Sequence, residues 1–371
     1  MRIGTFFSVR LFFLLSGALI AIFYAHPAPP FYLFVFFVIS LCFLVNLSKI
    51  KVDVVLLFLI FILVSVSILS VIVNSSGVHQ GLVPVVGVVL GYFLFLSGAF
   101  LTFNEYFWRG FSVSSLVLSF LILFFYFFSG STSFGFGVFY IPEFRMWGDE
   151  YFSDWPNYIG FPLVISLFLR RIRLIKFGMI DVMIVSAILL TTSRVLMFGV
   201  FLVLMLYVLF EKKSLLFFVV VSCFLAIFYL DLEPFFDRLT KFNDRSHLYS
   251  GLVEGWLVNP LLGWGGVKVS DVFPETYYDS YHNSYLEVLV KSGVVGFGIY
   301  VALILYLALS PYFKGRPLFH KQELYFLACL MFVIAASFFQ NYLKHPHVIF
   351  IFSALCHSGV KGVVGRNEKK L

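Results

Sequence analysis

Long apolar runs follow one another along the chain, and short polar segments separate them. The runs are continuous, whereas the strands of an outer-membrane barrel alternate apolar and polar residues over about ten positions. An α-helix needs about 20 apolar residues to cross the hydrocarbon core of a bilayer. The pattern therefore predicts twelve membrane-spanning helices, near residues 11–25, 31–47, 54–73, 82–103, 111–128, 157–169, 177–192, 195–210, 214–230, 286–309, 324–340 and 346–358.

Composition excludes the other broad classes of protein. Of the 371 residues, 61% are hydrophobic and 12% are charged, against roughly 25% charged in an ordinary soluble domain. A soluble fold of this length could not bury 51 phenylalanines. We therefore exclude a soluble enzyme, a disordered chain and a secreted disulfide scaffold. The fold class that we predict is an all-α, polytopic integral membrane protein, with a single membrane domain over residues 1–371.

The distribution of Lys and Arg predicts how the chain is oriented, because these residues collect in cytoplasmic loops. If the N-terminus is cytoplasmic, the loops on that side hold 18 of the 26 Lys and Arg residues. Both termini are then cytoplasmic, and the largest loop, residues 231–285, lies on the opposite side of the membrane and should contain short helices. The net charge of +7 follows from this topology and does not indicate a nucleic-acid partner.

Within the large loop, residues 244–258 have the pattern of an amphipathic helix that lies at the membrane interface. Asp244 is a candidate N-cap, and Asn259-Pro260 should end the helix. Its apolar face carries Leu248, Leu252, Val253 and Trp256, and its polar face carries Ser246, His247, Ser250 and Glu254. Arg245 falls at its start, where it either binds an anionic group at headgroup depth or extends its side chain to the interface.

A glycine-rich turn, residues 260–266, follows this helix and indicates that the backbone there comes close to another part of the molecule. Tyrosines then surround His282 and Asn283. Aromatic side chains beside polar groups can stack on sugar rings, and they are equally common in the aromatic belt of membrane proteins. His282 begins the next helix, where a histidine either caps the helix or takes a proton from a hydroxyl.

Other charged residues near the spans can have either a functional or a purely structural role. Arg194 lies between two apolar runs on the outer side, which is costly unless it faces a cavity or a partner. Glu287 and Lys291 are spaced to pair on one helix, and Asp181 lies close enough to an inner helix end to extend toward water. The four cysteines lie inside apolar runs without CxxC spacing, so we expect no metal site.

Three pieces of sequence, taken in order, resemble the O-antigen ligase/polymerase family of bacterial inner-membrane glycosyltransferases. The first is Ser193-Arg194 at the outer end of a helical hairpin. The second piece comprises Arg245, Trp256, Pro260, Gly263, Trp264 and Gly265. The third piece comprises residues 282–287, followed by Gly293 and Gly296. The motifs cover residues 185–300, and hydropathy alone supports the remainder of the resemblance.

The resemblance implies a metal-independent transferase without a cofactor, whose donor is a glycan on undecaprenyl diphosphate. It implies that Arg194 and Arg245 hold the diphosphate and that His282 is the catalytic base. We expect further substrate contacts from Trp264, Tyr281, Asn283 and Tyr285. The expected partners are the lipid-linked donor and acceptor, membrane lipids and a regulator of chain length.

Three functions remain open at this stage. The leading hypothesis is a polymerase that transfers the growing lipid-linked chain onto the next lipid-linked repeat unit. The alternative is a ligase that transfers it to lipid A–core, which needs the same Arg and His residues. A flippase or permease is a third hypothesis, although paired charges deep in several spans, which a permease should carry, are few here.

Overall fold

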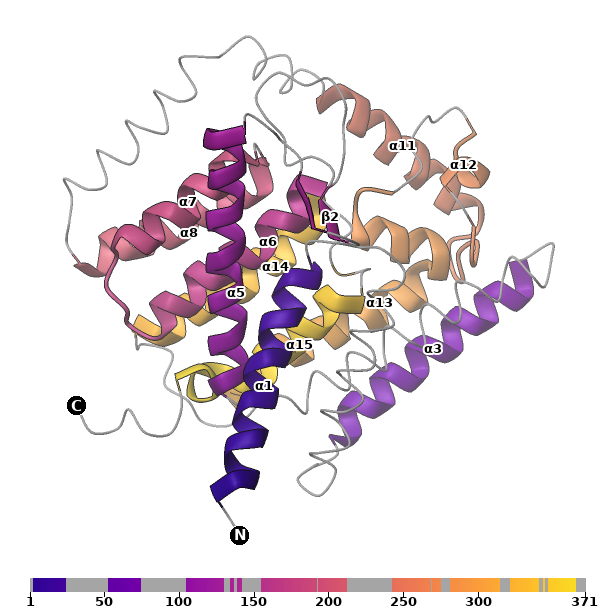
Figure 1. Ribbon diagram of the computed structural model, residues 1–371. Helices are drawn as coiled ribbons and strands as arrows, with labels where there is room; N and C mark the ends of the chain where they lie inside the picture. The colour runs from indigo at the N-terminus through magenta and orange to yellow at the C-terminus, as the bar shows by residue number, and fades with distance from the viewer. Residues whose placement is uncertain are drawn as a thin grey trace.

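The computed structural model describes residues 3–24, 53–74, 105–129, 134–136, 139–141, 155–191, 193–211, 242–267, 269–274, 281–313, 321–339, 343 and 346–364. In these ranges the chain is almost entirely helical (Figure 1). The helices are α1 (Ile3–Tyr24), α3 (Val54–Asn74), α5 (Glu105–Phe124), α6 (Trp155–Ile172), α7 (Met179–Leu190), α8 (Arg194–Glu211), α11 (Phe242–Val258), α12 (Val269–Val272), α13 (Ser284–Phe313), α14 (Lys321–Phe339) and α15 (Pro346–Val364).

The predicted fold class, an all-α membrane protein, is confirmed. In the part of the chain that is described, four helices are long and apolar enough to cross a membrane, at Val54–Val73, Glu105–Phe128, Ser284–Leu309 and Lys321–Phe339. Four shorter apolar helices accompany them. Nine of the twelve predicted spans coincide with helices, and the other three, 31–47, 82–103 and 214–230, lie outside the described residues. The count of twelve therefore stays a prediction.

Two small elements depart from the predicted pattern. A π-helix, η2 (Phe125–Ser129), continues α5. A two-stranded antiparallel hairpin follows, with β1 (Phe134–Phe136) paired to β2 (Phe139–Ile141). Each strand has three residues, so its alternation is too short to be recognised in the sequence.

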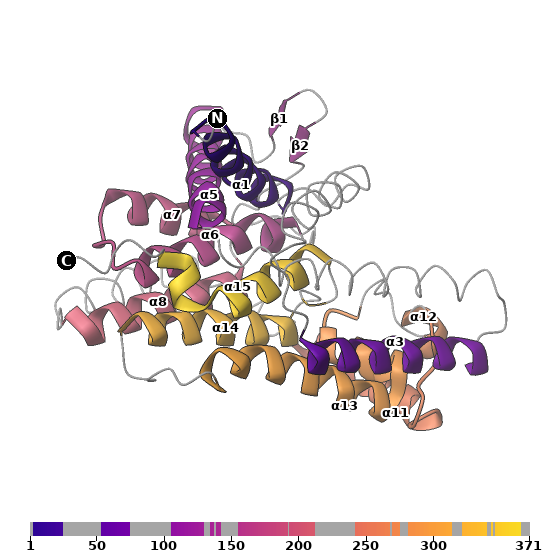
Figure 2. The same ribbon diagram turned by 90° about the horizontal axis from the view of Figure 1, so that it is seen from below.

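The helices pack in two neighbouring groups. The larger group contains α1, α5, α6, α7, α8 and α14, and the smaller group contains α3 and α13. α5 contacts α1, α6 and α7, and Gly17 and Gly110 allow the backbones of α1 and α5 to come close together. α14 contacts both α6 and α8, while α3 lies along α13 (Figure 2). α15 contacts both α13 and α14, so it joins the two groups. The main hydrophobic core runs through these helices and contains the fully buried rings of Trp108, Phe161 and Phe332.

Helix ends that were predicted to lie on the cytoplasmic side do lie together. Lys321 at the start of α14 pairs with Glu211 at the end of α8, at 3.4 Å. Tyr306 near the end of α13 donates to Asp53, which precedes α3, at 2.8 Å and 2.9 Å. α8 and α14 are therefore antiparallel, as are α3 and α13, and both pairs agree with the charge pattern. The side of the membrane that each end faces stays a prediction.

Asp181 is placed differently from our expectation. Its side chain is fully buried and does not extend toward water. Arg170 binds both of its carboxylate oxygens, at 2.8 Å and 3.1 Å, and Arg171 donates a third bond at 2.7 Å. The guanidinium of Arg171 also lies over the rings of Phe177 and Tyr207. The basic run between α6 and α7 is thus partly an internal ion cluster.

Candidate functional site

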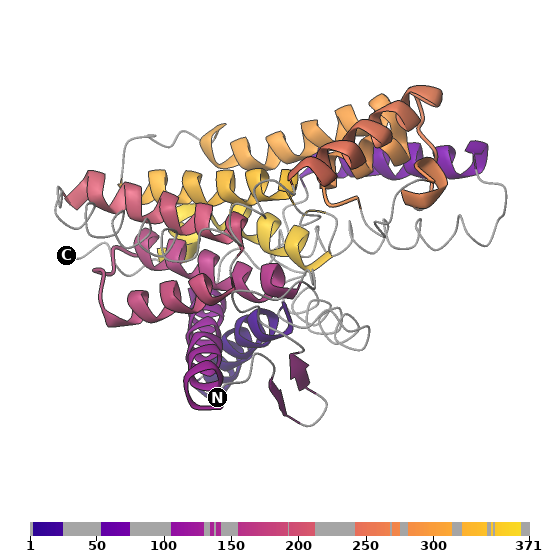
Figure 3. The ribbon, with the colours of Figure 1, turned by 90° about the horizontal axis from the view of Figure 1, so that it is seen from above.

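The amphipathic helix predicted in the large loop is present as α11, and it lies beside the start of α13 (Figures 1 and 3). It begins at Phe242, so Asp244 lies in the first turn and is not the N-cap that we expected, whereas Val258 ends it immediately before Asn259, as predicted. Helix starts are hard to place from sequence because caps and the first turn share residue types.

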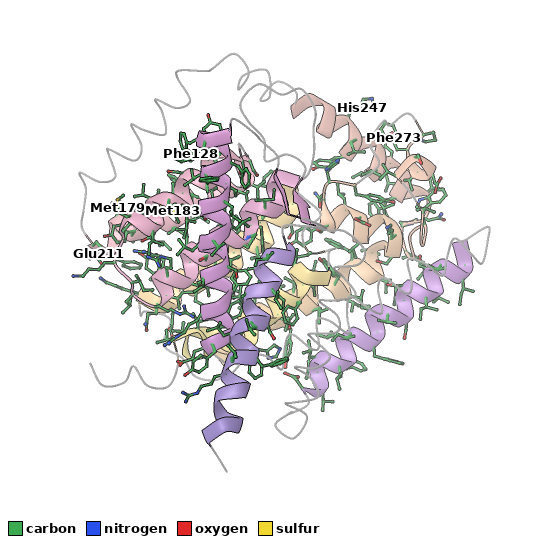
Figure 4. All side chains as sticks on the ribbon, viewed as in Figure 1. Phe128, Met179, Met183, Glu211, His247 and Phe273 are labelled. Atoms are coloured by element: carbon green, nitrogen blue, oxygen red, sulfur yellow. The ribbon has the colours of Figure 1, made fainter. Side chains whose placement is uncertain are left out.

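The two faces of α11 differ largely as the pattern indicated. Leu248 and Leu252 are buried and form a second core with residues of α12 and α13. His247 and Glu254 are exposed, and the ring of His247 lies 5.4 Å from that of Phe273 (Figure 4). Val253, which we assigned to the apolar face, is 37% exposed. The second core attaches α11 firmly to the start of α13.

The helix α13 is broken at Gly293, whose φ of 64° lies in the left-handed region. In an unbroken helix the amides of Val294 and Val295 would donate to carbonyls four residues earlier. Here Val294 donates instead to the Pro260 carbonyl at 2.9 Å, and Val295 donates to the Leu261 carbonyl at 3.4 Å. The glycine-rich turn after α11 thus occupies two positions of the hydrogen-bond ladder of α13.

The carbonyls released by the break are also bound by this turn. Trp264 donates its amide to the Val290 carbonyl at 2.8 Å, and Gly265 donates to the Lys291 carbonyl at 2.9 Å. The hydroxyl of Ser70 in α3 reaches the same Lys291 carbonyl at 2.7 Å. Because unsatisfied backbone groups are very costly at membrane depth, these bonds allow a broken helix there. We call residues 260–265 together with residues 290–295 the clasp.

Glycine is required at two positions of the clasp. Gly263 has a φ of 68°, and a Cβ there would collide with the Val290 carbonyl. A Cβ on Gly293 would collide with the Leu261 carbonyl. The close backbone approach that the glycine-rich turn indicated is therefore confirmed, and the structure identifies the partner as the backbone of α13. The contact joins the second and third pieces of the sequence motif.

His282 lies in a tight turn immediately before α13. Its side chain is half-buried, and its φ of 48° is in the left-handed region. The helix cap is Asn283, whose side-chain oxygen accepts bonds from the amides of Tyr285 and Leu286 at 2.9 Å and 3.0 Å. His282 is therefore not the capping residue. Its carbonyl accepts a bond from the hydroxyl of Tyr249 in α11, at 3.3 Å.

The residue before His282 is also firmly held. Tyr281 is 2% exposed and donates its hydroxyl to the Val267 carbonyl at 3.2 Å. Burial, together with the carboxylate of Glu287, raises the pKa of Tyr281 above its usual value, so the hydroxyl stays protonated. The ammonium of Lys291 lies 5.3 Å from the centre of the Tyr281 ring and pairs with Glu287 at 2.6 Å, so the predicted Glu287–Lys291 pair is present.

The four residues expected to contact substrate all make contacts inside the protein. Asn283 and Tyr281 do so as described above. Trp264 donates its indole N–H to the Gly255 carbonyl at 2.8 Å. Tyr285 donates to the Ile334 carbonyl at 3.1 Å and stacks on Phe338, with ring centres 4.1 Å apart. Their predicted role in binding substrate stays a prediction, and each also has a structural role.

Arg245 is placed by its position on α11, since its side chain lies outside the described part of the structure. It precedes Tyr249 by four residues, and residues at this spacing share a helix face. The face that carries Tyr249 meets the His282 turn, because the Tyr249 hydroxyl reaches the His282 carbonyl. The backbone of Arg245 therefore lies one helical turn from that contact.

Arg194, whose side chain also lies outside the described part, begins α8. Two contacts show that α8 and α14 are antiparallel. Lys321 meets Glu211, and a Cβ on Gly199 would touch the ring of Phe332. The start of α8 thus lies at the end of α14 where Phe338 stacks on Tyr285. Arg194 and the His282 turn are consequently at the same end of the helix bundle.

Sequence reasoning missed Tyr249 and Ser70, which hold the His282 turn and the clasp. The spacing of Tyr249 from Arg245 was visible in the sequence. Their partners were not, because His282 and Lys291 lie 33 and 221 residues away along the chain, and no local pattern links such positions.

Comparison with known proteins supports the resemblance noted in the sequence. Residues 179–301 match the family model described as O-antigen ligase. No curated protein matches the chain. The match confirms the resemblance to the O-antigen ligase/polymerase family over the segment that contains the motifs, from the start of α7 to Val301 in α13.

Proposed function

We propose that this membrane protein, whose residues 179–301 match the O-antigen ligase family model, is a glycosyltransferase that polymerises a lipid-linked glycan. It transfers the glycan from undecaprenyl diphosphate to a hydroxyl of the next lipid-linked repeat unit. It acts in the bacterial inner membrane, on the periplasmic side. One observation carries the proposal: the Tyr249 face of α11 and the turn bearing His282 form one packed unit at the end of a membrane helix.

The two arginines are proposed to hold the donor diphosphate. A diphosphate carries about two negative charges, and the planar guanidinium fork matches its oxygens. Each hydrogen bond to a charged group contributes about 1.5–3 kcal/mol. Arg194 and Arg245 would also stabilise the charge that develops as the C–O bond to the diphosphate breaks. Contacts that strengthen in this way favour the transition state over the ground state.

His282 is proposed to be the general base. It takes the proton of the acceptor hydroxyl while the acceptor oxygen bonds to the anomeric carbon and the diphosphate leaves. A positioned base typically contributes a factor of about 10²–10⁴ to the rate. A single displacement inverts the anomeric carbon. Glu287 is paired with Lys291, and within the described ranges we identify no carboxylate pair of the kind that a glycosyl-enzyme intermediate requires.

Ligase activity is the second candidate, because the matching family model is described as O-antigen ligase and the match supports either activity equally. A ligase uses the same donor and the same chemistry, and only the acceptor differs, being lipid A–core. A polymerase would in addition work with a regulator of chain length, whereas a ligase acts on chains that are already complete.

The chemistry is tested with purified protein in detergent and a lipid-linked donor, with product length as the readout. His282→Ala should abolish transfer at normal protein levels and still bind donor, because the arginines remain. His247→Ala, in the exposed histidine of α11, is the matched control and should retain transfer. Substantial turnover by His282→Ala would refute the assignment of the base. EDTA should leave the wild type active, and loss of turnover in EDTA would refute the metal-independent mechanism.

A further inference from the structure

We propose that Tyr249 is a positioning residue that holds His282 at a fixed place relative to α11, and so relative to Arg245. The inference rests on the proposed function, because it concerns how the same site is assembled. Tyr249 does not take part in the chemistry. It acts through the hydrogen bond from its hydroxyl to the backbone carbonyl of His282, at 3.3 Å.

The backbone of His282 needs such support. A residue with a Cβ is strained in the left-handed region, where His282 has its φ of 48°. Strained residues persist when their surroundings fix them in several ways, and they are concentrated at functional sites. Asn283 fixes the start of α13 on one side, and Tyr281 is buried on the other. The hydrogen bond from Tyr249 joins this turn to α11, in addition to the packing of Tyr281 in the second core with residues of α11.

The spacing along α11 links this bond to the donor site. Arg245 is one helical turn before Tyr249 on the same face, so a shift of the His282 turn along α11 changes the separation of base and diphosphate. Catalysis depends steeply on such separations, and a displacement of about 1 Å can cost a factor of about 10² in rate. The bond therefore controls the distance that the reaction needs.

The clasp makes it possible to test Tyr249 without unfolding α11. α11 is attached to α13 independently by the buried side chains of Leu248 and Leu252. The turn that follows α11 is joined to α13 by the backbone bonds of the clasp, such as that from Trp264 to Val290. Loss of one hydroxyl should therefore loosen the His282 turn while the surrounding helices remain in place.

The experiment compares Tyr249→Phe with Tyr306→Phe in the purified full-length protein, using a lipid-linked donor. Both changes remove one tyrosine hydroxyl that bonds to another element, and Tyr306 bonds to Asp53 at the opposite end of α13. For Tyr249→Phe we expect kcat to fall by about 10- to 100-fold, with KM for the donor within about twofold and an unchanged melting temperature. For Tyr306→Phe we expect an unchanged kcat.

Each other outcome decides against the proposal. A wild-type kcat in Tyr249→Phe, while His282→Ala is inactive, overturns the inference and leaves the proposed function standing. An equal loss of kcat in both tyrosine variants, or a Tyr249→Phe protein that does not accumulate, shows a merely structural role. A raised KM with normal kcat shows that Tyr249 contacts the donor instead. If the wild type transfers no glycan, the proposed function fails and the inference fails with it.

Discussion

The charged cluster around Asp181 shows how single residues determine stability in this protein. Asp181 is fully buried, and its two oxygens accept bonds from Arg170, Arg171 and the amide of Gly178. Arg171 is itself 2% exposed. Removing one member of a buried ion pair leaves the other charge without compensation, which typically costs about 3–5 kcal/mol.

We therefore expect Asp181→Ala to destabilise the protein strongly, by an amount in that range. Arg109→Ala is the control, because Arg109 pairs with Glu105 at 3.7 Å and its side chain is 51% exposed. A surface pair of this kind is worth at most about 1 kcal/mol. The measurement is thermal unfolding of the purified proteins in detergent. Equal melting temperatures of the two variants would contradict a stabilising role for the buried cluster.

At Arg245 the geometry of the side chain matters as well as its charge. Lys preserves the charge but cannot form the two parallel bonds of a guanidinium. We expect Arg245→Lys to insert and accumulate normally while it loses most of its transfer activity, measured with lipid-linked donor in detergent. Full activity in Arg245→Lys would show that charge alone suffices, or that Arg245 only extends to the membrane interface.

Exposure along α11 was largely predictable, with Val253 as the exception, whereas the contacts of the His282 turn were not. His247 is exposed because helical spacing places it opposite Leu248 and Leu252. By contrast, the residues that surround a tyrosine in the sequence can be the same whether its side chain binds a sugar or a backbone carbonyl. The sequence therefore could not separate a substrate contact of Tyr281 from its bond to Val267.

The break in α13 at Gly293 allows a direct test of the clasp between α13 and the turn after α11. Gly293 is left-handed and pressed against Leu261, whereas a Cβ on Gly298 in the same helix would meet nothing within 4 Å. Gly293 has φ 64° and ψ −172°, a region that is essentially restricted to glycine, and a residue with a Cβ is strained there by about 1–3 kcal/mol. We expect Gly293→Ala to lower both stability and activity.

Gly298→Ala is the matched control. Alanine is favoured over glycine inside a helix by about 1 kcal/mol, so this variant should be as stable as the wild type or slightly more stable. Thermal unfolding in detergent, followed by transfer assays on the surviving protein, measures both effects. If Gly293→Ala were as stable and active as Gly298→Ala, the clasp would not be needed to hold α11 against α13.

Whole helices were more predictable than the contacts between them. α3, α13 and α14 follow from the length and apolarity of their runs, because a bilayer imposes one minimum length on every span. The clasp depends on residues 260–265 meeting residues 290–295, and the sequence shows only that glycine is present at both places. Its pairing is decided by tertiary packing, including the hydroxyl that Ser70 supplies from α3.

At the scale of the whole molecule, the apolar surface makes sense only in a membrane. Phe58 and Phe61 of α3 are 61% and 70% exposed, and Phe127 and Phe128 after α5 are 70% and 79% exposed. In water such a surface would aggregate, whereas lipid solvates it at no cost. The lipid-linked substrates that we propose would diffuse in the bilayer, and a site at the start of α13 beside α11 would be within their reach.

Polymerase and ligase activities predict different products in the cell, because they act on different acceptors. Without a polymerase, single repeat units are still attached to lipid A–core, so a deletion strain should show core plus one repeat on a lipopolysaccharide gel. Without a ligase, bare core should appear and long lipid-linked polymer should accumulate. We expect the first pattern. The wild-type gene and His247→Ala should restore the ladder when expressed in the deletion strain, and His282→Ala should not. Bare core would establish the ligase instead, and an unchanged ladder would contradict both functions.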